Sequence, residues 1–133
     1  MQLLAVVAAI LLGVSYGHPV VRQAAEKRTA EMLVGIWDDV KLNGRPPEFG
    51  QYVTMEFTRD GKAIIRYKAR NDPPGVQRAT YKVVGNAIQM VMLSGTTGKT
   101  RTLVIKRLTA DTLITAHPVE SYGVTESVRR RAK

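Results

Sequence analysis

Hydrophobic and polar residues alternate along most of the chain after residue 32, and this alternation predicts β-strands. In the segment 51–58, Val53, Met55 and Phe57 share one face of an extended chain, and polar residues occupy the other. The same period of two recurs in further short segments that end at turn-forming residues. The predicted strands are residues 33–42, 51–58, 62–69, 77–84, 87–93, 99–108, 112–117 and 124–130.

The connections between these strands are short, which favours an antiparallel arrangement. Asp60-Gly61 is typical of a type I′ hairpin turn, in which both central residues have positive φ. An open sheet of this many strands leaves two unpaired edges, whereas a closed barrel leaves none. The sequence therefore predicts an all-β fold, a small antiparallel up-and-down barrel of about eight strands.

The first 17 residues carry no charge and contain an apolar run over residues 3–14. Such a run, as a helix of about 18 Å, is shorter than the ~30 Å hydrocarbon core of a bilayer. Small residues follow at Ser15 and Gly17, which suits a signal peptidase. We therefore predict a signal peptide over residues 1–17, cleavage before His18, and a secreted or periplasmic location.

Two other interpretations of this segment are an uncleaved anchor and a buried helix. A helix that is apolar on all sides needs a larger core than this chain can build around it, so export is favoured. Residues 18–32 are rich in Ala, Glu, Lys and Arg and are predicted to form a leader or short helix. The barrel domain is then expected to span residues 33–131.

The amino-acid composition limits the kinds of site and partner that the chain can have. Among its 133 residues, 20 are Lys or Arg and 11 are Asp or Glu, for a net charge of +9, and none is cysteine. Disulfides, thiolate catalysis and cysteine zinc sites are therefore excluded. Basic residues gather at the C-terminus and along the third and sixth predicted strands. Such stripes could contact anionic lipid or polymers of the cell envelope, whereas export argues against a nucleic-acid partner.

Three short motifs resemble chemical sites, and each has a simpler interpretation. Residues 95–100 end like a phosphate-binding loop, but a strand pattern follows where a helix is required, so we predict a hairpin turn. Asp38 and Asp39 are adjacent on a strand and point to opposite faces, so they cannot act on one atom. Copper binding through His18 and His117 is a minor alternative, because His18 is far from the first strand.

Gly35 and Trp37 form a G-x-W motif at the start of the first predicted strand, directly after the predicted helix. In this position, ahead of a run of short strands, the motif resembles the lipocalin signature, and the chain looks like small exported bacterial lipocalin-like domains. The resemblance implies that a basic residue at the end of the last strand packs over the Trp ring. Arg129, Arg130 and Arg131 are the candidates, and we predict Arg130 because it would share the face of Val128.

The resemblance also implies a function, the non-enzymatic binding of a small apolar ligand inside the barrel, with no cofactor and no metal. The alternative is a structural or interaction module with a filled barrel, whose basic exterior contacts anionic envelope polymers or lipids. The protein is predicted to be a monomer under both interpretations. The ligand-binding residues predicted on the inner wall are Val53, Met55, Phe57, Ile65, Tyr67, Tyr81, Val83, Leu103 and Ile105.

Overall fold

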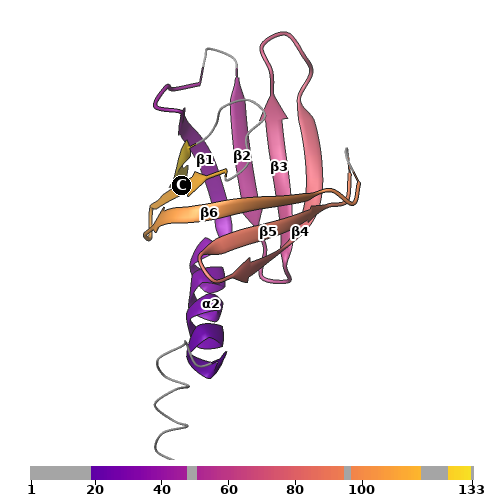
Figure 1. The fold of residues 1–133 in the computed structure, drawn as a ribbon. Coiled ribbons are helices and arrows are strands. Elements are labelled where there is room, and N and C mark those ends of the chain that lie inside the picture. The colour runs from indigo at the N-terminus through magenta and orange to yellow at the C-terminus, as the bar shows by residue number, and fades with distance from the viewer. Residues whose placement is uncertain (1–18, 48–50, 95–96, 118–125, 133) are drawn as a thin grey trace, which may run out of the picture.

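The computed structural model describes residues 19–47, 51–94, 97–117 and 126–132. In this part of the chain one helix, α2, precedes eight strands. The strands pair in chain order, each antiparallel to the next, until β8 pairs with β1 and closes the barrel (Figure 1). The predicted closed barrel is confirmed. The elements are α2 (Pro19–Leu33), β1 (Gly35–Leu42), β2 (Tyr52–Phe57), β3 (Lys62–Lys68), β4 (Gly75–Val84), β5 (Ala87–Met92), β6 (Thr100–Leu108), β7 (Thr112–Ala116) and β8 (Glu126–Arg131).

The predicted boundaries of the elements were close, with one informative exception. Leu33 was expected to open the first strand, but it is the last residue of α2 and is fully buried in the core. Its apolar side chain continues the strand pattern in sequence, although it reaches the core from the end of the helix. The predicted start of the last strand, at Val124, and the predicted signal peptide over residues 1–17 lie outside the described residues.

One end of the barrel is closed by α2 and by three tight turns. The helix projects from this end (Figure 1), and its Glu26 carboxylate accepts a hydrogen bond from the backbone N–H of Gly85 in the β4–β5 turn. Most of the helix is exposed, because only its C-terminal turn packs into the core. Within the described ranges, no helix is both long and apolar enough to span a bilayer.

The turn between β2 and β3 differs from the predicted type I′ hairpin. Only Gly61 has a positive φ, of 82°, whereas Asp60 keeps a negative one. The Thr58 N–H donates to the Lys62 carbonyl at 2.8 Å, and the Gly61 N–H donates to Thr58 at 3.3 Å. This pattern is that of a longer hairpin loop in which one glycine takes the left-handed conformation.

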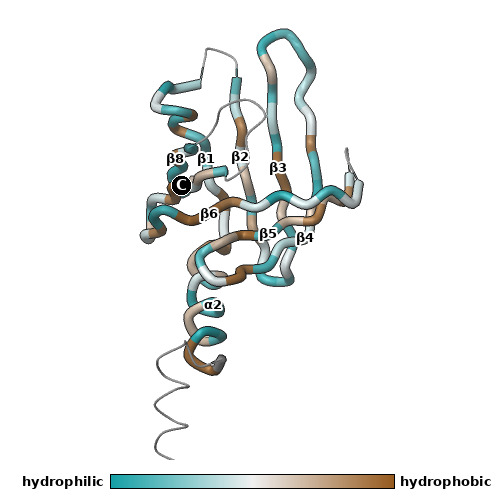
Figure 2. The backbone as a smooth tube through the Cα atoms, in the orientation of Figure 1, coloured by the Kyte–Doolittle hydropathy of each residue, from teal (hydrophilic) through white to brown (hydrophobic). Residues whose placement is uncertain are grey.

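Hydrophobic and polar residues alternate along the strands, as the change between brown and teal in Figure 2 shows. Trp37, Phe57, Ile88, Met90 and Leu113 are almost completely buried. Because neighbours on a strand point to opposite faces, the residues between them lie outside.

Two β-bulges interrupt this alternation, one after Asp39 in β1 and one after Ile105 in β6. In β1, Asp39 pairs with Arg129, and Leu42 pairs with Ser127. The extra residue returns Leu42 to the inner face, three positions after Asp39, where regular alternation would place it outside. The bulge therefore brings two inward-facing residues of β1 to the open end of the barrel.

Candidate functional site

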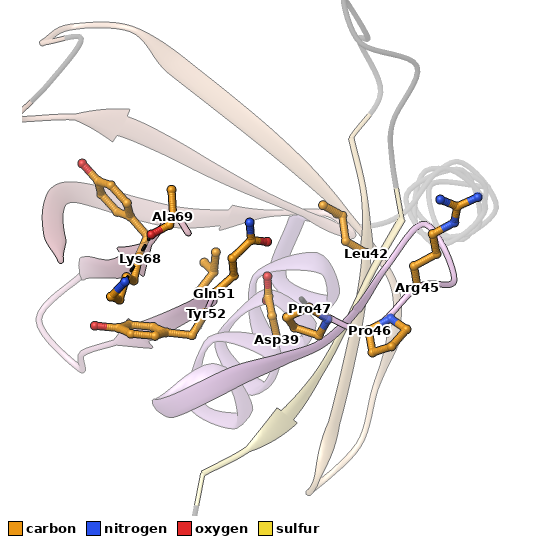
Figure 3. Close-up of a pocket in the computed structure, with 11 residues that line it drawn as sticks. Asp39, Leu42, Arg45, Pro46, Pro47, Gln51, Tyr52, Lys68 and Ala69 are labelled. Carbon is orange, nitrogen blue, oxygen red and sulfur yellow. Dashed lines mark hydrogen bonds between the residues drawn. The ribbon is translucent and has the colours of Figure 1, made fainter. Parts of the chain in front are cut away.

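A cavity of about 450 Å³ lies at the open end of the barrel, opposite the helix. It is formed by the ends of β1, β2 and β3 and by the segments that follow β1 and β3. Figure 3 shows Asp39 and Gln51 in the middle of the site, with Tyr52 and Lys68 on one side and Leu42 on the other. The described lining residues are Asp39, Leu42, Arg45, Pro46, Pro47, Gln51, Tyr52, Val53, Tyr67, Lys68 and Ala69.

One lining residue, Asp39, forms a mostly buried ion pair with a residue outside the lining. The Asp39 side chain is 11% exposed, and its Oδ1 atom is 2.7 Å from Nε of Arg129, whose side chain is 6% exposed. This contact is a close ion pair between two mostly buried side chains. The Arg129 Nη1 atom donates a hydrogen bond of 2.7 Å to the Thr115 hydroxyl.

Burial dominates the electrostatics of this pair. Desolvation raises the pKa of Asp39 above its usual value of 3.8, and the positive charge of Arg129 opposes this effect. Desolvation also lowers the pKa of Arg129; the charge of Asp39 opposes that shift, and the nearby charge of Arg101 adds to it. Arg129 nevertheless remains protonated, because a guanidinium does not lose its proton in proteins.

Burying such an ion pair inside a barrel costs free energy of folding. Removing two charges from water costs several kcal/mol per ion, and apolar residues of similar volume often give a protein of equal or greater stability. Departures from good local packing are expected at functional sites. The buried pair that joins Asp39 of the cavity to Arg129 therefore favours this region as the candidate site.

The predicted inner-wall residues divide between the core and the cavity. Val53 and Tyr67 line the cavity, with Tyr67 at its mouth, where it is 37% exposed. The others fill the barrel below it. The buried members are Met55, Phe57, Ile65 and Leu103, and the partly buried members packed against them are Tyr81, Val83 and Ile105.

The residue that packs over Trp37 is Arg131, and the prediction of Arg130 is corrected. The Arg131 guanidinium carbon lies 4.3 Å from the centre of the Trp37 ring. On β8 the inner face carries Arg129 and Arg131, whereas Arg130 is exposed and pairs with Asp38 on the outer face. The prediction failed because it placed Val128 on the inner face.

Gly35 of the motif has a steric role beside this stack. Its φ is +133°, and a side chain there would overlap the Arg131 guanidinium. The same guanidinium donates hydrogen bonds of 2.7 Å to the carbonyls of Met32, Val34 and Ala110. The G-x-W motif and Arg131 thus join the end of α2 to the closed end of the barrel.

The other candidate motifs are placed as follows. Asp38 lies on the outer face and accepts a hydrogen bond of 3.0 Å from Thr54, whereas Asp39 points inward, as the alternation predicted. Thr100 begins strand β6, as predicted for the segment after residue 98. His117 follows β7, and its buried Nδ1 atom has no hydrogen-bond partner among the residues that the structure describes. His18 lies outside the described residues, so the copper alternative remains a prediction.

No group of three or more His, Cys, Asp or Glu side chains that could hold a metal occurs in the ranges that the structure describes. Sequence reasoning missed Arg129, Thr115 and Leu42. The basic run at residues 129–131 could have indicated Arg129, but the choice within it depends on the register of β8. Leu42 could not be placed without the bulge in β1.

Solved structures share this architecture. A lipocalin-like protein from Bacteroides uniformis matches with a TM-score of 0.54 and 16% identity, over 76% of this chain and 99% of that chain. An uncharacterized protein from Bacteroides eggerthii matches with a TM-score of 0.53 and 15% identity, over 75% of this chain and 99% of that chain. No protein-family model and no curated protein matches the sequence. The fold is therefore lipocalin-like, as the G-x-W motif predicted.

Proposed function

We propose that this protein binds a small, largely apolar molecule in the cavity at the open end of the barrel. The observation that carries the proposal is the cavity itself, whose volume of about 450 Å³ falls within the ~300–1,000 Å³ typical of ligand pockets. Below the cavity the barrel is filled by side chains. The ligand would therefore occupy the open end rather than the whole interior.

The lining has the composition of a binding pocket. Leu42, Val53 and Tyr67 supply apolar and aromatic surface, and Asp39 and Gln51 supply a few polar atoms. The carboxylate of Asp39 is paired with Arg129. These features support the binding of a ligand that is largely apolar.

A fluorescence titration with the neutral, apolar probe N-phenyl-1-naphthylamine tests this function. The wild-type protein is expected to bind the probe, and Val53→Trp is expected to weaken binding by about tenfold because the larger side chain fills the cavity. Val76→Trp is the matched control, because Val76 lies on the outer face of β4 and is 49% exposed. Equal binding by the two variants, or no binding by the wild type, would reject the proposal.

Native mass spectrometry of protein purified from its own host tests the proposal independently. A retained adduct of defined mass would support a ligand, and its loss in Val53→Trp would place the adduct in the cavity. The mass of the mature chain would also test the proposed export, which predicts loss of residues 1–17.

The exterior supports a second candidate function, contact with anionic polymers or lipids. Lys62, Arg78 and Lys82 are exposed on the outer face of β3 and β4. Binding to vesicles that contain anionic lipid, lost at high salt and weakened in a Lys62→Gln/Arg78→Gln/Lys82→Gln variant, would support this candidate. Absence of binding at low salt would reject it.

A further inference from the structure

We infer that the protein binds an acidic oligosaccharide in a hollow on the outer face of β4, β5 and β6. The inference deepens the second candidate function, on which it rests, because it names one site on the basic exterior and one class of polymer. It follows from the register of the three strands, the unused hydrogen-bonding groups of the hollow, and its charge. It does not depend on the cavity at the open end of the barrel.

This outer hollow has a volume of about 470 Å³, which falls within the range typical of ligand pockets. Met90 of β5 is fully buried, so its neighbours Gln89 and Val91 face outward. The outward residues form two rows across the three strands, with Thr80, Val91 and Thr100 in the first and Lys82, Gln89 and Thr102 in the second. From the spacing of strands and of alternate residues, the rows cover about 10 by 7 Å, which is comparable to a disaccharide.

The polar side chains of the outer hollow are not used within the fold. Among the described residues, none of its three threonine hydroxyls has a hydrogen-bond partner. Each of the other threonines in the described ranges uses its hydroxyl in a hydrogen bond, as Thr54 does with Asp38. The amide of Gln89, which is half-buried, also has no partner in this part of the chain. Because hydroxyls and amides both donate and accept, these groups are suited to the hydroxyls of a sugar.

One apolar side chain lies among these polar groups. Val91 is 41% exposed and pairs with Thr80 on one side and with Thr100 on the other. A sugar ring carries hydroxyls at its rim and C–H groups on its faces, so a ring above Val91 would place hydroxyls near the threonines. A flat membrane surface cannot enter a hollow, so the shape of the site favours a polymer chain over a lipid layer.

The charge of the outer hollow favours an acidic sugar over a neutral one. Lys82 is exposed and lies beside Gln89 in the second row, and Lys62 of β3 lies beside Thr80 of the first row. The described lining residues include no carboxylate. An exposed ion pair contributes only about 0.2–1 kcal/mol, so a carboxylate at Lys82 would add to the affinity that the hydroxyl contacts provide.

Three tetramers test the inference by titration calorimetry at low salt: tetragalacturonate, its methyl ester, and tetraglutamate with both ends blocked. The methyl ester keeps the sugar hydroxyls without the charge, and tetraglutamate keeps the charge without the sugar hydroxyls. We expect tetragalacturonate to bind about tenfold more tightly than tetraglutamate, because only the sugar hydrogen-bonds to the threonines. It should bind about fivefold more tightly than the methyl ester, because only the acid pairs with Lys82.

Two variants separate these contributions. Thr100→Val/Thr102→Val removes two hydroxyls with little change of size, in strands that valine suits, and should weaken tetragalacturonate binding about tenfold without affecting tetraglutamate. Lys82→Gln should weaken tetragalacturonate binding about fivefold and leave binding of the methyl ester unchanged. Lys41→Gln is the matched control, because Lys41 is exposed on the outer face of β1. Thermal unfolding checks that each variant keeps the fold.

Other outcomes overturn the inference in distinguishable ways. Equal affinity for tetragalacturonate and tetraglutamate would reject a sugar site but leave contact with anionic polymers intact. Tightest binding of the methyl ester would reject an acidic ligand. Equal effects of Lys82→Gln and Lys41→Gln would reject this location. Binding of anionic vesicles without binding of any tetramer would make a lipid layer the partner instead, and failure of vesicles and tetramers alike would reject the second candidate function as well.

Discussion

Arg131 illustrates how one side chain can connect three parts of the barrel. Its guanidinium covers the Trp37 ring and donates hydrogen bonds to carbonyls at the end of α2 and in the turn between β6 and β7. A stacked cation contributes about 0.5–2 kcal/mol, and a hydrogen bond from a charged donor contributes about 1.5–3 kcal/mol. These contacts share one side chain, so their sum overstates the effect of losing it.

Arg131→Ala is therefore expected to lower the free energy of unfolding by about 2–4 kcal/mol. Arg130→Ala, one residue away on the exposed face, should change it by less than about 0.5 kcal/mol. Urea unfolding followed by Trp37 fluorescence measures both values. Similar losses in the two variants would contradict the assignment of Arg131 as the stacking residue.

Gly35 and Gly44 allow the cost of backbone strain to be distinguished from the cost of steric overlap when a side chain is added. Both residues have a positive φ, but a side chain would overlap Arg131 at Gly35 and would meet nothing at Gly44. Gly44→Ala should cost about 1–2 kcal/mol from backbone strain alone. Gly35→Ala should cost more because it also displaces the guanidinium. Thermal unfolding of the two variants checks this order, and an equal cost would argue against the steric role of Gly35.

At the scale of elements, the turns at the closed end are stabilised by threonine–aspartate hydrogen bonds. Thr58 donates to Asp60, and Thr109 donates to Asp111 at 2.9 Å. These hydrogen bonds lower the pKa of both exposed aspartates below 3.8. The folded state therefore binds these protons less tightly than the unfolded state, so the contribution to stability is present above about pH 4 and is lost as pH falls.

A Thr58→Val/Thr109→Val variant should be less stable than the wild type at neutral pH and lose less stability between about pH 6 and pH 3. Asp39 acts in the opposite direction, because burial raises its pKa, and this contribution is common to both proteins. Urea unfolding at several pH values provides the comparison, with the exposed Thr80→Val as the control. If the double variant lost as much stability between about pH 6 and pH 3 as the control does, the proposed role of the hydrogen bonds would be contradicted.

At the scale of the whole molecule, closure of the barrel depends on the last strand. β8 pairs with β7 and with β1, and it supplies both Arg129 and Arg131. Without it the sheet would have two open edges and would lack the groups that hold its closed end.

Truncation after residue 125 should therefore abolish cooperative thermal unfolding. Circular dichroism in the near ultraviolet, which reports the packing of Trp37, should lose its native signal. Arg130→Ala, which retains the strand, is the control. A cooperative transition in the truncated chain would show that the remaining strands form a stable unit without closure.

Much of this molecule follows from local patterns in the sequence. The period of two placed the described strand ends to within two residues, because side chains on a strand must alternate between core and solvent. The adjacent Asp38 and Asp39 were placed on opposite faces for the same reason. The G-x-W motif indicated the fold that the solved structures share.

The candidate site depended on tertiary structure, because neither of its main determinants is local. The bulge in β1 turns Leu42 toward the cavity, where it stays 55% exposed, and the register of β8 selects Arg129 and Arg131 rather than Arg130 for the inner face. A shift of one residue in a strand exchanges its two faces, and pairing between strands distant in sequence fixes that shift. The sequence by itself determined which segments are strands and that they close; only the pairing of β1 with β8 decided which charges lie inside.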